Sequence, residues 1–229
     1  MRIWERFPDV ATRVREEHEK VGLVGHHDFM HAYRVGEVAY QVALTEWSDD
    51  RRAQLAGLAG LCHNADHLLR KQVGAGSETA LRESIAQLVQ SWIERSVDKI
   101  AMAEVIDAVV KHNQKNSAND SLVLVALMDA DRVVNLDVDL FIRSGQMHHK
   151  LPAVDHRHFL DDPKATYRDP KSVLRDIGYS LDWANPQSDV CIRTREGIAM
   201  ARNRLGIFLT FFDALKMQLT EEGAYPFPS

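Results

Sequence analysis

Hydrophobic residues recur at intervals of three and four along most of the chain, which is the spacing of one face of an α-helix. The pattern is clearest near the C-terminus, at Ile198, Ala201, Leu205, Phe208, Phe212, Leu215 and Leu219. No stretch of strict apolar and polar alternation is long enough to predict a β-strand. The pattern therefore predicts an all-α protein.

Turn-forming and capping residues divide this pattern into separate helices. We expect helices at about 9–21, 28–48, 51–71, 78–95, 99–112, 121–135 and 190–221. Asp28 and Ser77 stand where N-caps of two of these helices are needed. The segment of about 144–170 holds much of the proline and histidine of the chain, and we expect a long irregular loop there.

No internal repeat or linker divides the chain, so the sequence predicts a single-domain helical bundle over residues 1–229. The composition, with 45% hydrophobic and 27% charged residues, is typical of soluble globular proteins. The net charge of -5 and the scattered Lys and Arg residues argue against a nucleic-acid partner or an anionic membrane surface. No run approaches a membrane span of about 20 apolar residues.

The first ten residues carry charges where a signal peptide would have its apolar core, so we expect a cytoplasmic protein. The two cysteines, Cys62 and Cys191, are then expected to be reduced, with Cys62 a small core residue.

Polar residues interrupt the predicted apolar faces at four places. They are His31, the string LCHNADHLL with His63, His112, and Asp131. Asp131 shares a helical stripe with apolar residues, so its carboxylate is expected to point toward the core, where it needs a cation, strong donors or a proton. Imidazoles and a carboxylate from neighbouring helices form a ligand set for a divalent transition metal.

Three strings resemble the motifs of the HD-domain metal-dependent phosphohydrolases, in the same order and spacing along residues 23–137. HHDFMHAYRVGEVA resembles the opening His-x-x-Arg-Val helix of that family, LAGLCHNADH its Leu-Ala-small-Leu-Leu-His-Asp element, and LMDADRVVNLD its Asp-Ala-Asp-Arg-Leu element. The tail RTREGIAMARNRLGIFLTFFDAL is similar to the closing helix of small single-domain members. The resemblance implies an HD-type bundle that hydrolyses a nucleotide or other small phosphorylated compound with a metal-activated water.

Carried over by position, the resemblance implies that His31, His63 and Asp131 bind the metal, which would be Mn, Fe, Co, Ni, Zn or Mg. The family's second His is followed by Asp, whereas here Asn64 follows His63. An asparagine offers a neutral oxygen without charge and is a poor bridge between ions. The site is thus either a weaker working site or a degenerate one that binds a phosphorylated ligand without hydrolysis.

On a continuous helix Asp66 and His67 would face the same way as His63, so they are candidates to replace the missing carboxylate and to act as general acid or base. Arg34 and Arg132 are candidate phosphate contacts, because a guanidinium matches phosphate oxygens. The resemblance adds Asn135 as a contact to a base or sugar.

Each of these residues also has a structural interpretation. Asp131 could pair with Arg34 or Arg132, and His112 could simply be a helix-end residue. In a third interpretation, the chain is a purely structural helical protein whose polar residues form hydrogen bonds and ion pairs only with one another.

Overall fold

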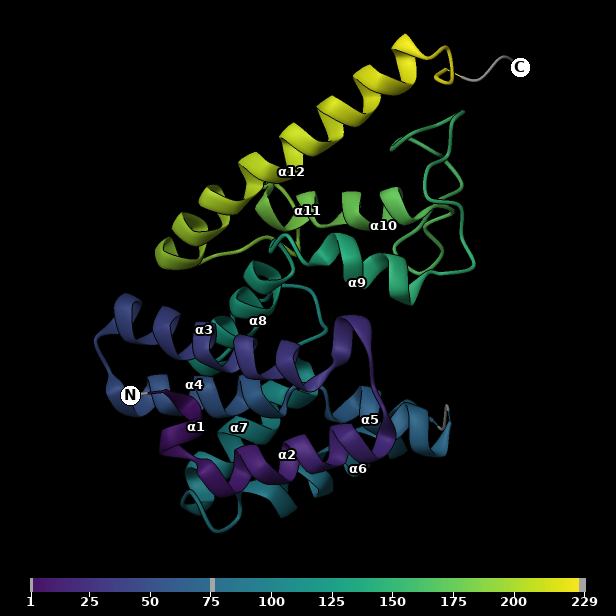
Figure 1. The fold of residues 1–229 in the computed structure, drawn as a ribbon. Helices are drawn as coiled ribbons and strands as arrows, with labels where there is room; N and C mark the ends of the chain where they lie inside the picture. Colours follow the sequence, from purple (N-terminus) through teal and green to yellow (C-terminus); the bar gives the residue numbers. More distant parts are fainter. Residues whose placement is uncertain (1, 75–76, 227–229) are drawn as a thin grey trace.

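The computed structural model describes residues 2–74 and 77–226, and within these ranges the chain is built of helices (Figure 1). The extended pairing among those residues is limited to one bridge between Thr166 and Asp169. The prediction of an all-α fold is therefore confirmed. The helices, in chain order, are α1 (Ile3–Arg6), α2 (Pro8–Val21), the short 3-10 helix η1 (Gly25–His27), α3 (Phe29–Trp47), α4 (Asp50–Cys62), α5 (Ala65–Val73), α6 (Glu78–Ile93), α7 (Lys99–Lys111), α8 (Leu122–Val134), α9 (Leu140–Met147), α10 (Val173–Tyr179), α11 (Leu181–Ala184) and α12 (Arg195–Glu221).

Helices α1 to α8 surround a first hydrophobic core, in which α4 packs against α3, α7 and α8. The crossing of α3 and α4 is close because glycines face each other there. A Cβ atom on Gly60 would lie 2.7 Å from the Cα atom of Gly36. The small residues of the predicted third helix thus permit the close approach expected of them, and this brings the N-terminal turn of α3 beside the end of α4.

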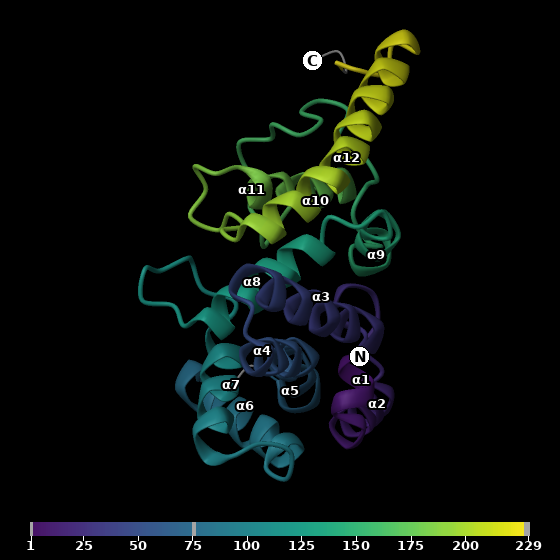
Figure 2. The same ribbon diagram turned by 90° about the vertical axis from the view of Figure 1, so that its left-hand side faces the viewer.

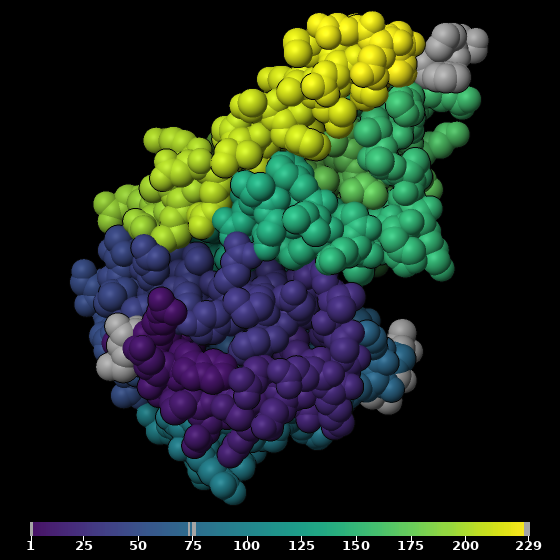
Figure 3. Space-filling model, viewed as in Figure 1, coloured from purple at the N-terminus to yellow at the C-terminus, as the bar shows by residue number. Residues whose placement is uncertain are grey.

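Helices α9 to α12 surround a second hydrophobic core that includes Leu136, Ile177 and Phe208. Helix α8 lies between the two groups of helices in both ribbon views (Figures 1 and 2). Val38 and Met200 pack against both cores and join them. The surface is indented on the right in Figure 3, between the green segment that follows α9 and the N-terminal bundle. No helix in the described part of the chain has the length and apolar character needed to cross a membrane.

The predicted N-caps form as expected. The Asp28 side chain accepts from the backbone N–H of His31 at 2.7 Å, and that of Ser77 accepts from Ala80. Gly22 ends α2 in the left-handed conformation, with φ of 67°. These local signals therefore fix the end of α2 and the starts of α3 and α6.

The helix predicted over 51–71 is instead two helices that meet at His63 and Asn64. Nδ1–H of His63 donates to the carbonyl of Gly60 at 2.6 Å, and the backbone N–H of His63 also reaches that carbonyl at 3.4 Å. This carbonyl would accept from the N–H of Asn64 in a continuous helix. The helical hydrogen-bond pattern is therefore interrupted here, and α5 begins at Ala65.

The predicted loop at 144–170 and the start of the last helix also differ from the structure. Helix α9 continues to Met147, and α10 and α11 follow the irregular segment. The last helix begins at Arg195, with Thr194 as its N-cap, rather than near 190. Helices as short as α9 to α11 have little stability of their own, so packing on the second core rather than a periodic pattern defines them.

Candidate metal centre

Three helices bring His31, His63 and Asp131 together, with one ligand atom from each within 4.8 Å of the others. His31 lies in the first turn of α3, His63 at the end of α4 and Asp131 in α8. Nε2 of His31 is 3.1 Å from Oδ1 of Asp131, and Nε2 of His63 is 3.8 Å from the same oxygen. The two imidazoles are buried, whereas the Asp131 side chain is 24% exposed, so the carboxylate is the member of the group that solvent reaches.

A hydrogen bond from the ring nitrogen of His63 that faces away from Asp131 fixes the orientation of this side chain. Its Nδ1–H donates to the carbonyl of Gly60, which leaves Nε2 without a proton in the neutral ring and directed toward Asp131. Burial lowers the pKa of His63 well below its usual value. A neutral imidazole with a free Nε2 is the form that binds metals. His112, whose ring edge meets His63 at a centroid distance of 5.4 Å, is fixed in the same way by the carbonyl of Val109 at 2.7 Å.

Asp131 is ionised although it lies among buried groups. Burial alone would raise the pKa of this carboxyl, but the hydrogen bond from His31 holds the pKa well below its usual range. The amide of Asn135 also donates to Oδ1 at 3.0 Å. The centre therefore has one negative charge that a cation would offset.

Asn64 is fully buried at the break between α4 and α5. Its amide nitrogen donates to the backbone carbonyl of His27 at 3.1 Å and lies 3.5 Å from that of Asp28. Its Oδ1 is buried and has no hydrogen-bond partner. This unpartnered oxygen belongs to the residue that follows His63 in the chain, and sequence alone did not reveal it.

The break also changes the expected positions of Asp66 and His67, which were expected to face the same way as His63. Asp66 does not join the three ligands. Its Oδ2 instead lies 3.3 Å from the Asn113 amide and 3.6 Å from Nε2 of His67. His67 stacks on His27 with ring centroids 3.4 Å apart, and burial lowers its pKa. The other oxygen of Asp66, Oδ1, is buried and has no hydrogen-bond partner, so the replacement of the missing carboxylate by Asp66 stays a prediction.

The two arginines proposed as phosphate contacts have other partners. Arg34 forms ion pairs with Asp137 and Asp139. Arg132 is buried, and its Nη1 donates to Oδ1 of Asn116 at 2.7 Å and to the carbonyl of Cys191 at 2.8 Å. Neither arginine forms an ion pair with Asp131, so the alternative interpretation of that pairing is not observed either.

Arg143 on α9 was not a candidate from sequence, yet it is the buried cation closest to the group. Its Nη1 donates to Oδ1 of Asn135 at 3.1 Å and lies 3.5 Å from Nδ1 of His31. Arg143 thus orients Asn135, which in turn holds Asp131. The only sequence signal for it is an arginine in a short apolar segment, which does not distinguish it from a surface residue.

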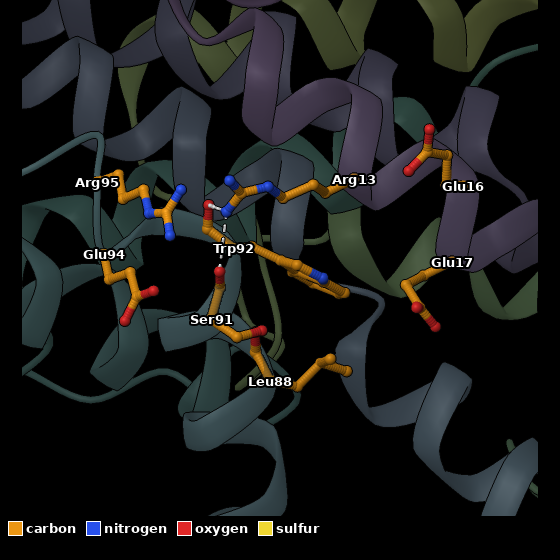
Figure 4. Close-up of a pocket in the computed structure, with 8 residues that line it drawn as sticks. All are labelled: Arg13, Glu16, Glu17, Leu88, Ser91, Trp92, Glu94 and Arg95. Atoms are coloured by element: carbon orange, nitrogen blue, oxygen red, sulfur yellow. Dashed lines mark hydrogen bonds between the residues drawn. The ribbon is translucent and has the colours of Figure 1, made fainter.

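A divalent metal fits these residues. Two ligand atoms about 2.1 Å from one ion lie about 3.0–3.4 Å apart at ordinary coordination angles. The 3.1 Å between His31 and Asp131 falls in this range, and the 3.8 Å between His63 and Asp131 lies above it and requires a wider angle or a small movement of His63. The hollow drawn in Figure 4 is unrelated to this centre. It lies between α2 and α6, where Arg13 donates to the carbonyls of Ser91 and Trp92 at 3.0 and 3.3 Å and thereby caps the end of α6.

No family model matches this chain, and neither a curated protein nor a solved structure matches it. The chemistry of the centre is therefore argued from its own residues.

Proposed function

We propose that this protein is a metal-dependent phosphohydrolase of the HD-domain type that acts on a nucleotide or another small phosphorylated compound. The observation that carries the proposal is the convergence of His31, His63 and Asp131 within 4.8 Å, from positions up to 100 residues apart. These are the positions at which the sequence motifs resemble that family. Three polar residues that only satisfied one another would not need the unprotonated Nε2 that His63 directs at Asp131.

In this proposal Nε2 of His31, Nε2 of His63 and a carboxylate oxygen of Asp131 hold a divalent cation, with Oδ1 of Asn64 as an additional neutral donor. The chemistry that such an ion supplies when bound is Lewis acidity toward phosphoryl oxygens and water. Asp131 keeps its negative charge at neutral pH. Its carboxylate is oriented by a hydrogen bond from Asn135, which in turn accepts from Arg143. Neither Arg34 nor Arg132 is assigned to the phosphate, because carboxylates or backbone carbonyls already occupy their guanidinium groups.

His67 is the residue suited to move a proton. Its ring is neutral at neutral pH, because burial lowers its pKa, and Oδ2 of Asp66 lies 3.6 Å from its Nε2. A neutral imidazole accepts a proton, and a nearby carboxylate stabilises the imidazolium that results. Asp66 is therefore proposed to support His67 rather than to bind the cation.

The competing proposal is a degenerate domain that binds a phosphorylated ligand without hydrolysis. It is favoured by Asn64, which adds no charge where the family's motif has a carboxylate and whose amide hydrogen bonds tie η1 to α5. The two proposals share the same metal and ligand chemistry, so only turnover separates them.

The test is a hydrolysis screen of nucleoside mono-, di- and triphosphates with Mn, Co, Ni or Mg, with wild type beside His63→Ala. His156→Ala, on an exposed loop, is the control for loss of a histidine. We expect turnover by wild type and by the control, and none by His63→Ala. Equal and negligible turnover by all three proteins would reject the hydrolase, and absence of bound metal in wild type would reject both proposals.

A further inference from the structure

Tyr167 is an exposed aromatic residue in the irregular segment between α9 and α10. Its side chain is 65% exposed, yet its ring packs edge-to-face on Tyr179 with centroids 5.9 Å apart and an interplanar angle of 78°. This contact leaves the faces of the Tyr167 ring without another aromatic neighbour among the described residues. A large ring that is fixed by one contact and otherwise mostly exposed is suited to stack on a planar group.

Helix α10 connects this ring to the metal centre. Asp176 lies between Arg175 and Tyr179 in that helix, and its carboxylate accepts from Ser144 at 2.7 Å. The same carboxylate lies 3.5 Å from Nε2 of His26, in η1 just before the helix that carries His31. Nδ1 of His26 in turn lies 3.5 Å from Arg143. The tyrosines are therefore fixed to the elements that position the ligands.

The phenol of Tyr167 lies close enough to Asp131 and Asp176 for their charges to act on it. Desolvation, followed by the negative charges of Asp131 and Asp176, raises the pKa of Tyr167 to about 12. Tyr167 belongs to the segment that follows α9, and Figure 3 shows an indented surface beside that segment.

Two buried polar atoms beside the ring have no hydrogen-bond partner. They are Oη of Tyr179 and Nε of Arg175, whose guanidinium lies over the Tyr179 ring, 4.0 Å from its centroid. Buried polar groups are rarely left unsatisfied, so these atoms are available to a partner that binds beside Tyr167. A nucleobase offers both the planar face and the polar edge that such a surface would bind.

We propose that Tyr167, backed by Tyr179, is the specificity-determining residue that receives the planar aromatic part of the substrate, a nucleobase, while the phosphoryl group faces the metal centre. The inference rests on the proposed function only in calling the bound compound a substrate. The binding surface itself needs neither metal nor turnover. It predicts selection of nucleotides over sugar phosphates, because a sugar phosphate has no planar face to stack on the ring. Stacking depends on the ring and not on the phenolic hydroxyl, so Phe should replace Tyr167.

The experiment measures binding of adenosine, AMP and ribose 5-phosphate by calorimetry, with EDTA present and again with Mn, to wild type, Tyr167→Ala and Tyr167→Phe. We expect Tyr167→Ala to weaken adenosine and AMP about tenfold or more, as loss of one base–aromatic stack does. Tyr167→Phe should bind both as wild type does, and ribose 5-phosphate should not distinguish the three proteins. Tyr33→Ala is the matched control, because that ring stacks on Phe29 on the α1 and α2 side of α3.

The outcomes separate this inference from the proposed function. If Tyr167→Ala binds adenosine and AMP as wild type does, if wild type binds neither, or if Tyr167→Phe loses as much as Tyr167→Ala, the stacking role is overturned. Hydrolysis of ribose 5-phosphate and nucleotides with equal kcat/KM overturns it as well, while leaving the hydrolase in place. Conversely, ring-dependent AMP binding without any turnover supports the inference and rejects the hydrolase. Circular dichroism melts verify that each variant is folded.

Discussion

Replacing Asn64 with Asp tests whether this buried position faces the metal centre. In wild type the amide donates to the carbonyl of His27, and Oδ1 has no partner. Asn64→Asp removes the donor and sets a carboxylate against that carbonyl oxygen. Losing the hydrogen bond costs about 1 kcal/mol, and leaving a buried group unsatisfied adds about 1–3 kcal/mol. Without metal the variant should therefore be destabilised by about 2–4 kcal/mol.

A bound divalent cation should reverse part of this loss, because the new charge lies beside the other ligands. A ligand at 100 times its Kd stabilises the folded state by about 2.7 kcal/mol, and each tenfold gain in affinity adds about 1.4 kcal/mol. For a chain of this size, 1 kcal/mol moves Tm by about 2–4 °C. We expect Asn64→Asp to melt roughly 4–16 °C below wild type in EDTA and to gain at least about 3 °C more than wild type from saturating Mn.

The assay is thermal unfolding of both proteins in EDTA and in Mn, followed by calorimetric titration of Mn. Asn119→Asp, at an exposed turn residue, is the control for the added charge and should change neither Tm nor Mn affinity. If Asn64→Asp melts like wild type in EDTA and responds equally to Mn, the reasoning about the orientation of Asn64 is refuted. Activity then shows which site is native: a large gain indicates a degenerate wild-type centre, and a loss indicates a working variant of it.

Four further changes test the remaining assignments. Asp131→Asn should weaken Mn binding about 100-fold or more, measured by calorimetry, because it removes the only charge among the ligands. Arg132→Met should lower the free energy of urea unfolding by about 2–4 kcal/mol without changing Mn affinity, because this guanidinium ties α8 to Asn116 and Cys191. Burial lowers the pKa of His18, so its neutral form stabilises the fold above the unfolded pKa of about 6.5. That stability should be lost as pH falls below about 6.5, by at most about 1.4 kcal/mol per pH unit, and less steeply in His18→Gln, measured by urea unfolding at pH 7.5 and 5. Gly60→Ala should destabilise by about 1–3 kcal/mol in the same assay, because its Cβ would overlap the backbone of α3.

The break at His63 shows where a pattern-based prediction fails. Apolar periodicity continues through residues 51–71, and nothing in that pattern separates a continuous helix from two helices. The break depends on one side chain taking the carbonyl of Gly60. The periodic pattern therefore could not fix how Asp66, which follows the break, is placed relative to His63.

Arg143 and Tyr167 show a different reason for a miss. Each belongs to a segment without a strong helical pattern, and each acquires its surroundings from residues distant in the chain. The contact between Arg143 and His31 spans 112 residues. No local signal reports such a contact, whereas Asp28 and Ser77 cap the helices that immediately follow them and were predicted correctly.

The sequence by itself determined the all-α fold and the helices that carry His31 and Asp131, because helical periodicity and capping are properties of neighbouring residues. It also pointed to these two residues and His63 as a ligand set, through their chemistry and order. Only the tertiary structure decided that the three meet within 4.8 Å, that Asn64 presents an unpartnered oxygen, and that Arg34 and Arg132 have other partners. These are properties of packing between distant segments, since burial and the neighbouring charges set the protonation and partners of each side chain.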